Sequence, residues 1–489
     1  MISESVRIRK NSLFSFLSMA SRLFTNVIIY WIIARFYGKE IFGQFTSAQT
    51  IAITFIFIAD FGLDLLLTTE LPKNIQNKVA IFNQYFSIKI VFTFVAFVSI
   101  LSLGIWGNFS QDIKTLLRIF SLFVVFTTIT NFLSALYKGS ERLEYETFVN
   151  FIANSISLII ILVLIFLHKD IFVISIAFTV TKLLGLLVTV YYALKIIPVS
   201  RLKFHFGDFR LIKNQVIVFG IFWIFGNLFF QLDTILLTFW DSAESVGLYQ
   251  AVFKLVMLPL IIPDIFVNSL LPTLSRLKLE DSVKWEKLVY IFNKLLVIVS
   301  IPISVTLFIY PEQIINLIYG GKEYSQAIPI LQIFAIILFI RFFSETYGLI
   351  LTTSNQQKIR MYIVVVGTAV NLIINFFLIP SHGAFGASIT SLVTNIFVGL
   401  SYTYFSFKLV KNWIKHVQFL KLILITTFII VMELFLKFVG YWYLSIVPLI
   451  IYFVYSYLIL LLPVEKKYFS EFKITNDRKI FKNILPRCQ

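Results

Sequence analysis

One stretch of the chain, residues 156–167, reads Ile-Ser-Leu-Ile-Ile-Ile-Leu-Val-Leu-Ile-Phe-Leu. Apolar and polar residues do not alternate in it, as they must in the strands of a transmembrane β-barrel. It closes a longer apolar run, residues 147–167, which has the roughly 20 residues that a helix needs to cross a bilayer. Because only helices and closed barrels satisfy their backbone hydrogen bonds in lipid, the run predicts a transmembrane helix.

Similar runs recur along the whole chain. Of its 489 residues, 58% are hydrophobic and 14% are charged, whereas soluble domains have about 45–50% and about 25%. This composition excludes a secreted, cytosolic or disordered protein and indicates an all-α polytopic membrane protein. The apolar runs predict about fourteen spans, at residues 12–34, 41–63, 85–106, 116–137, 147–167, 171–194, 214–239, 248–271, 289–310, 327–351, 361–380, 384–407, 422–438 and 442–462.

Few residues are suited to metal or redox chemistry. The single cysteine, Cys488, excludes an internal disulfide and a cysteine-based zinc or redox site. The four histidines are scattered near the ends of apolar runs, at His168, His205, His382 and His416. We therefore expect no metal site and no cofactor. The first apolar run is too long for the core of a signal peptide, so we expect it to remain as the first span.

The placement of Lys and Arg residues predicts the orientation, because short cytoplasmic loops carry an excess of both. With a cytoplasmic N-terminus and an even number of spans, the basic stretches all lie inside, at residues 7–10, 195–213, 276–287, 408–421 and beyond 463. The outside loops then carry only Arg35, Lys39, Lys114, Lys169 and Lys322. We therefore expect both termini in the cytoplasm. The net charge of +17 comes largely from residues that flank spans, so it does not indicate a nucleic-acid partner.

A short pattern, Glu-x-apolar-Gly-x-aromatic, occurs twice, at residues 40–45 and 244–249. The same offset aligns Asp60 with Asp264, and a slightly larger one aligns Ser140 with Ser354. Their common order predicts two duplicated six-span bundles with a substrate site between them. We assign the chain as an N-terminal bundle, a C-terminal bundle, two further spans and a basic cytoplasmic tail, at residues 1–200, 201–415, 416–463 and 464–489.

Several motifs resemble those of the bacterial polysaccharide flippases of the multidrug/oligosaccharidyl-lipid/polysaccharide exporter superfamily. They are Asp233-Thr-Ile-Leu-Leu, Val246-Gly-Leu-Tyr-Gln-Ala251, Leu271-Pro-Thr-Leu-Ser275, Gly321-Lys-Glu-Tyr-Ser-Gln-Ala327, residues 371–380 and Gly383-Ala-Phe-Gly-Ala-Ser388. The resemblance covers most of the chain, roughly residues 12–410. It implies a MATE-like fold. It also implies that undecaprenyl-pyrophosphate-linked sugar units move from the cytoplasmic to the outer leaflet of the bacterial cytoplasmic membrane, for O-antigen, capsule or related glycans.

Two predicted spans carry a cation on a polar face. Arg22 shares one helix face with residues three or four positions apart, namely Asn11, Ser15, Ser18 and Asn26. Lys182 has a weaker stripe of the same kind, formed by Ser175, Thr179 and Gly185. A charge inside the bilayer is costly and usually faces protein or a water-filled interior. Neither face is therefore expected to contact lipid.

We expect these cations to line a cavity between the two bundles, where they replace the lost hydration of a pyrophosphate headgroup. The predicted substrate-binding residues are Arg22, Lys89, Arg118, Lys182, Lys254 and Arg341. All of them except Lys254 have an alternative role that the sequence leaves open. Arg118 is close enough to a span end to reach the membrane surface, and the position of Lys89 depends on where the third span starts. Arg22 and Lys182 could instead form internal ion pairs, and Arg341 could be neutralised by Glu345 one turn away.

Three acidic residues within spans are candidates for coupling transport to a proton or sodium gradient: Asp233, Asp264 and Glu345. A buried carboxyl group can load and release a proton in the working pH range. Asp233 matches an aspartate that recurs in the resembled family, where a role in packing is an equal alternative.

The favoured hypothesis is a flippase for lipid-linked oligosaccharide in the bacterial cytoplasmic membrane, which carries out no covalent chemistry. The nearest alternative is a lipid II flippase, followed by a MATE-type drug exporter. A membrane glycan polymerase is disfavoured because no loop is long enough to hold a catalytic domain. Membrane lipids are expected partners, and a polysaccharide polymerase and glycosyltransferases are candidate protein partners.

Overall fold

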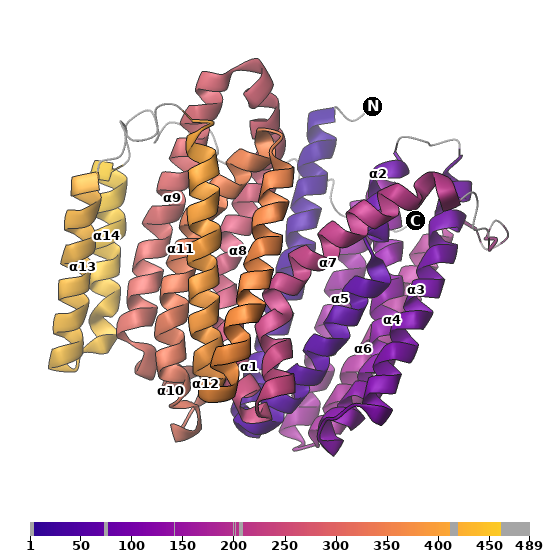
Figure 1. Ribbon diagram of the computed structural model, residues 1–489, viewed down its shortest axis with the longest axis horizontal. Coiled ribbons are helices and arrows are strands. Elements are labelled where there is room, and N and C mark those ends of the chain that lie inside the picture. The colour runs from indigo at the N-terminus through magenta and orange to yellow at the C-terminus, as the bar shows by residue number, and fades with distance from the viewer. Residues whose placement is uncertain are drawn as a thin grey trace, which may run out of the picture.

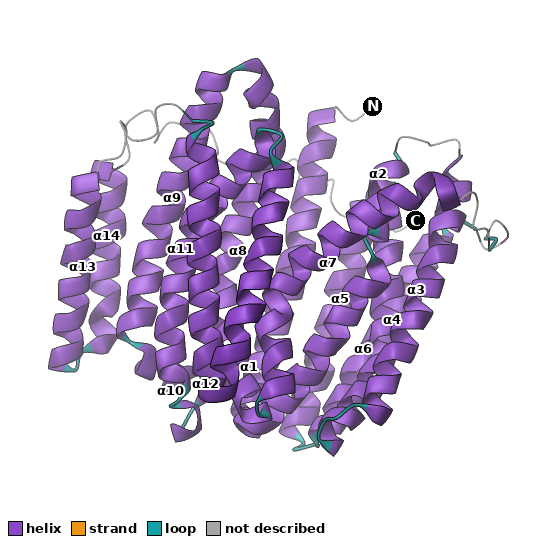
Figure 2. Ribbon diagram, in the orientation of Figure 1, coloured by secondary structure: helices purple, strands orange, loops and turns teal. Residues whose placement is uncertain are grey.

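The computed structural model describes residues 4–72, 77–140, 142–198, 200, 202–204, 209–410 and 419–460. Within these ranges the chain is helical, with no strands (Figure 2). The helices are α1 (Glu4–Asp60), α2 (Leu63–Glu70), α3 (Lys78–Trp106), α4 (Gln111–Gly139), α5 (Leu143–Phe166), α6 (Ile171–Leu194), α7 (Phe209–Trp240), α8 (Ala243–Glu280), α9 (Ser282–Ile309), α10 (Pro311–Tyr319), α11 (Ala327–Thr353), α12 (Gln357–Phe407), α13 (Phe419–Val439) and α14 (Ile446–Tyr455).

Two of these helices, α1 and α12, each contain two spans joined at a glycine. Gly38 in α1 has φ 76° and Gly383 in α12 has φ 51°, in the left-handed region that glycine adopts without a steric penalty. Among the described residues, eleven helical ranges are long and apolar enough to cross a membrane, and α1 and α12 are counted once each. When α1 and α12 are counted as two spans each, these eleven ranges and α7 account for the fourteen predicted spans.

The predicted boundaries differ from the structure near the second and third spans. α1 ends at Asp60, because Phe61 and Gly62 both have positive φ values, and the short helix α2 follows. α3 begins at Lys78, about two turns earlier than predicted. Lys89 therefore lies well inside a helix, away from the span end.

The helices form two groups (Figure 1). In the first, α1 packs against α3, α4 and α5, and α4 packs against α6. In the second, α11 packs against α8, α9 and α12, while α7 packs against α12. The predicted boundary at residues 200/201 falls between α6 and α7, and the boundaries at 415/416 and 463/464 lie outside the described residues. The assignment of these groups as separate domains stays a prediction.

The last two described spans, α13 and α14, lie at one edge of the molecule, beside α9 (Figure 1). Ile425 and Ile429 of α13 and Tyr452 of α14 are buried against Val297, Ile298 and Ile301 of α9. Two hydrogen bonds attach α13 to the end of α9. Lys437 Nζ donates to the carbonyl oxygen of Ile309 at 2.6 Å, and the Tyr310 hydroxyl donates to the carbonyl oxygen of Glu433 at 2.7 Å.

The two groups meet closely at the end of the molecule that holds the kinks at Gly38 and Gly383, here called the kinked end. A Cβ atom added to Gly43 of α1 would overlap the carbonyl oxygen of Ala243 in α8. A Cβ atom added to Gly247 of α8 would likewise overlap that of Lys39. These two glycines let the backbones of α1 and α8 approach each other. The charge bias predicts that this end faces outside.

A segment of the second group, residues 311–324, lies across α1 at the kinked end. Arg35 donates to the carbonyl oxygens of Leu317 and Ile318 at 2.9 and 3.1 Å, which satisfies groups that a helix C-terminus leaves open. Tyr324 donates to the carbonyl oxygen of Ala34 at 2.8 Å. Burial raises the pKa of Tyr324, so its hydroxyl stays protonated. These contacts hold the two groups together at this end.

Candidate functional site

Arg22 of α1 and Lys182 of α6 lie near each other in the first group. Arg22 is exposed and Lys182 is partly buried, and the two cations are close enough for electrostatic repulsion. Lys182 Nζ lies 5.2 Å from the centre of the Phe178 ring. Within the described part of the chain, neither cation has a carboxylate oxygen within 4.0 Å. The alternative of a structural ion pair therefore has no support among these residues.

The polar faces around these two cations are turned inward where they are described. Ser18, Ser175 and Thr179 are buried, and Asn150 of α5 donates to the hydroxyl of Ser18 at 2.8 Å. The side chains of Asn11 and Ser15 lie outside the described residues. These three stripe residues therefore pack against protein, while Arg22 itself is exposed.

Lys89 of α3 lies in a different environment. Its ammonium group donates to Asp60 Oδ1 at 2.9 Å and to Asp64 Oδ1 at 2.7 Å, and its side chain is 1% exposed. The structure does not bring it together with Arg22 and Lys182. The sequence interpretation missed Asp64, although its spacing of four from Asp60 signals a shared face.

Arg118 lies in the second turn of α4 and is exposed. It donates to the carbonyl oxygen of Lys114 at 3.3 Å and to the hydroxyl of Thr115 at 3.4 Å. These contacts stay within its own helix. The position agrees with the alternative in which Arg118 reaches the membrane surface.

Lys254 of α8 faces the first group. Its Nζ lies 4.2 Å from the centre of the Tyr30 ring in α1, in the geometry of a cation–π contact. Tyr30 is buried and donates to Gln49. No carboxylate among the described residues lies within 4.0 Å of Lys254. The two groups therefore present cations from α1, α6 and α8.

Arg341 lines a cavity of about 270 Å³ between α7, α11 and α12, here called the C-terminal cavity. Its guanidinium carbon lies 4.5 Å from the centre of the Phe230 ring. Glu345 also lines the cavity, but its ion pair is with Arg360 of α12, at 3.6 Å. The sequence interpretation missed Arg360, because the residue begins a span and resembles an ordinary flanking cation. Asp264 of α8 is exposed and acts electrostatically on Arg341.

Asp233 of α7 is the most enclosed of the three acidic candidates. Its carboxylate accepts hydrogen bonds from four side chains of α8 and α12: Tyr249 at 2.7 Å, Asn371 at 2.9 Å, Asn375 at 2.6 Å, and Ser391. Four donors satisfy a buried carboxylate without a counter-ion.

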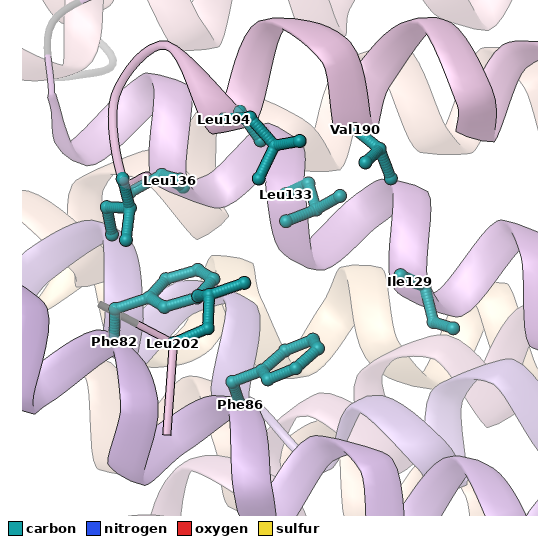
Figure 3. Close-up of a pocket in the computed structure, with 10 residues that line it drawn as sticks. Phe82, Phe86, Ile129, Leu133, Leu136, Val190, Leu194 and Leu202 are labelled. Carbon is teal, nitrogen blue, oxygen red and sulfur yellow. The ribbon is translucent and has the colours of Figure 1, made fainter. Parts of the chain in front are cut away.

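A second cavity, of about 110 Å³, lies between α3, α4 and α6. Figure 3 shows the aromatic and aliphatic side chains around it, among them Phe82, Phe86 and Leu133. None of the predicted site residues lines it. No cluster of three or more metal-ligating His, Cys, Asp or Glu side chains occurs in the described ranges.

Comparison with known families identifies the kind of protein. The sequence profile described as polysaccharide biosynthesis protein matches residues 7–278, more than half of the chain. The chain belongs to the polysaccharide biosynthesis protein family. The MatE profile matches residues 217–377 in addition. These matches confirm the predicted resemblance and the superfamily, and they identify a multi-pass membrane protein of a transporter family.

Individual relatives are distant. An uncharacterised membrane protein of Methanocaldococcus jannaschii is 23% identical over 84% of this chain and 86% of its own length. The teichuronic acid biosynthesis protein TuaB of Bacillus subtilis is 27% identical over 32% of this chain and 31% of its own length. A Salmonella typhi protein named as an O-antigen transporter is 25% identical over 47% of this chain and 55% of its own length.

Solved structures confirm the predicted MATE-like fold. Lipid II flippase MurJ in an inward closed conformation has a TM-score of 0.72 at 16% identity, over 91% of this chain and 98% of that one. An inward-facing multidrug resistance MATE family transporter has a TM-score of 0.65 at 10% identity, over 82% of this chain and 98% of that one.

Proposed function

We propose that this protein flips a polyprenyl-pyrophosphate-linked oligosaccharide from the cytoplasmic to the outer leaflet of the bacterial cytoplasmic membrane. The undecaprenyl carrier and the repeat units of O-antigen, capsule or a related glycan are the proposed substrate. The family match to polysaccharide biosynthesis proteins supports this assignment. So does the name of the Salmonella typhi relative.

The observation that carries the proposal is the set of cations without carboxylate partners. Arg22, Lys182 and Lys254 lie on helices of both groups, and no described carboxylate neutralises them. Such charges are costly inside a membrane unless a ligand or water accompanies them. A pyrophosphate supplies the complementary charge, and Arg and Lys donors replace the hydration that it loses.

The arrangement of the two groups supports alternating access. The groups are held together at the kinked end by the contacts of Gly43 with α8 and of Arg35 with α10. With the orientation that the basic residues predict, this closed end faces outside and the substrate loads from the cytoplasm. We propose that the bundles 1–200 and 201–415 rock against each other, as in other transporters built from repeats.

We propose Asp233 as the residue that couples flipping to a proton or sodium gradient. Among the three acidic candidates, Asp233 contacts side chains of α8 and α12 together, so a change in its charge would alter the packing of three helices. Glu345 is already paired with Arg360. Asp264 is exposed.

A deletion strain tests the function directly. We expect surface polysaccharide to disappear while complete lipid-linked repeat units accumulate on the cytoplasmic leaflet, with normal levels of peptidoglycan precursors. The readout is extraction of the lipid-linked sugars, combined with their accessibility to a membrane-impermeant enzyme in intact cells and in inverted vesicles.

Other outcomes of the same experiment favour the alternatives. Accumulation of lipid II would favour a lipid II flippase, for which MurJ offers only a likeness of fold. A build-up of unpolymerised units on the outer leaflet would indicate a polymerase that acts after the flip. Normal glycan export combined with sensitivity to cationic drugs would indicate a drug exporter.

A further inference from the structure

The C-terminal cavity is lined by residues of α7, α11 and α12, and neither Arg22 of α1 nor Lys182 of α6 lines it. Its volume of about 270 Å³ lies just below the range of about 300–1,000 Å³ that is typical of pockets for drug-sized ligands. A ligand that fits it is therefore small, of the size of one sugar ring. An extended lipid chain would not be enclosed.

The lining of this cavity combines aromatic faces with planar polar groups. Phe229 and Phe230 lie at 87° to each other with their centres 5.6 Å apart. Arg341, Glu345 and Arg360 add charged edges. This combination suits a sugar ring, because its C–H faces are apolar and its rim carries hydroxyl groups that donate and accept hydrogen bonds.

The charged groups keep hydrogen-bonding capacity for a ligand. The pair between Arg360 Nη2 and Glu345 Oε1 is 3.6 Å long, and the two side chains are 35% and 29% exposed. This distance is longer than a charge-assisted hydrogen bond, which measures about 2.7–2.9 Å. Arg341 has no carboxylate within 4.0 Å among the described residues. The carboxylate and both guanidinium groups can therefore contact hydroxyl groups of a bound sugar.

Gly226 of α7 provides an independent observation. A Cβ atom added to it would meet nothing within 4 Å, whereas one added to Gly367 of α12 would lie 3.0 Å from Val398. Glycine in the middle of a helix costs about 0.5–1 kcal/mol relative to alanine. Among the described residues, no packing contact requires this glycine, and the absence of a side chain leaves space in the cavity that Gly226 lines.

We propose that the C-terminal cavity binds a sugar ring of the lipid-linked oligosaccharide, while the cations of α1 and α6 bind its pyrophosphate. This inference rests on the proposed function. The headgroup then bridges the two bundles, and only a glycan-loaded lipid contacts both of them. The protein would therefore bind the lipid-linked oligosaccharide more tightly than polyprenyl pyrophosphate without sugar.

Binding measurements on the full chain in nanodiscs test the proposal with two probes. One is undecaprenyl pyrophosphate without sugar, and the other is the lipid-linked oligosaccharide extracted from cells that lack the protein. We expect Gly226→Leu to weaken binding of the oligosaccharide lipid about tenfold or more, since a filled pocket loses its sugar contacts. We expect the affinity of Gly226→Leu for undecaprenyl pyrophosphate without sugar to stay unchanged. Arg22→Ala weakens both.

Gly226→Ala is the matched control, because its methyl group fits the open space and gives the same gain in helix propensity without filling the cavity. We expect it to weaken binding of the oligosaccharide lipid less than Gly226→Leu does. Asn395→Ala is a second test that adds no bulk: it removes an amide that lines the cavity and is expected to weaken only the oligosaccharide lipid. Thermal unfolding of each variant checks that it is folded.

Two results would overturn the sugar site. One is unchanged affinity of both Gly226→Leu and Asn395→Ala for the oligosaccharide lipid. The other is an equal loss of affinity for both probes. If the unchanged protein binds neither probe, the proposed function itself fails, and this outcome is distinct from the first two.

Discussion

Gly43 of α1 and Gly247 of α8 pack against each other's helices at the kinked end, and each leaves room for a backbone carbonyl of the other helix. They occupy equivalent positions of the pattern that the sequence repeats at residues 40–45 and 244–249. An ion pair between Lys39 and Glu244 lies beside them. The repeated pattern thus forms a symmetric contact between the two groups of helices.

Replacing either glycine should open this contact. In Gly43→Ala and Gly247→Ala the added methyl group overlaps a carbonyl oxygen, so we expect the closed outer end to become less populated. Opening of this end can be measured by the reactivity of a single introduced cysteine, in a protein that also carries Cys488→Ser. Ser47→Cys is suitable, because Ser47 is 0% exposed and accepts a hydrogen bond from Thr238 at 3.1 Å. A membrane-impermeant thiol reagent should label it from outside only in the glycine variants.

The control for this experiment is Gly226→Ala, which adds the same methyl group in open space and should leave Ser47→Cys unlabelled. If Gly43→Ala and Gly247→Ala also protect the cysteine fully and export glycan normally, the glycine contact does not close the outer end.

The group of Lys89, Asp60 and Asp64 predicts a stability effect. Lys89→Met leaves the buried carboxylate of Asp60 and the part-buried one of Asp64 without their cation, and breaking a buried ion pair costs about 3–5 kcal/mol. We expect much less folded protein in the membrane, measured by thermal unfolding in detergent. The triple variant with Asp60→Asn and Asp64→Asn should recover folding and export. A triple variant that folds but fails to export would instead indicate that Lys89 takes part in substrate binding.

Arg22 and Lys182 are expected to be required for export. Loss of a hydrogen bond to a charged group costs about 1.5–3 kcal/mol, or about ten- to a hundredfold in affinity. Arg22→Ala and Lys182→Ala should therefore reduce surface glycan strongly while the protein remains inserted. Arg118→Ala is the matched control, because its contacts stay within α4. If Arg22→Ala and Lys182→Ala both export glycan normally, the pyrophosphate site would instead be assigned to Lys254 and the second group.

Asp233→Asn tests the coupling proposal. The change removes the charge, and the new amide places a donor against side chains that now donate to the carboxylate. We expect flipping in proteoliposomes to lose its dependence on a proton or sodium gradient. Ser391→Ala removes one donor but keeps the charge, so it should retain gradient dependence. An Asp233→Asn variant that still follows the gradient would leave Asp233 with a structural role alone.

Some site residues could be recognised along the chain and others could not. The polar stripe of Arg22 was visible because residues three and four apart share a helix face. The role of Lys89 was not visible, because its partners Asp60 and Asp64 come from two other helices. The pairing of Glu345 with Arg360 instead of Arg341 has the same origin, since α12 must fold back along α11 to supply it.

The sequence by itself determined that the chain is a helical membrane protein with about fourteen spans, because the hydrophobicity and length of a span are local properties. It also indicated the duplication and the superfamily. Only the tertiary structure decided which charges are neutralised, where Gly43 and Gly247 meet, and that a cavity lies beside Gly226. These features depend on contacts between helices far apart in the chain. In lipid such contacts arise from close packing and polar pairing, which hydropathy does not record.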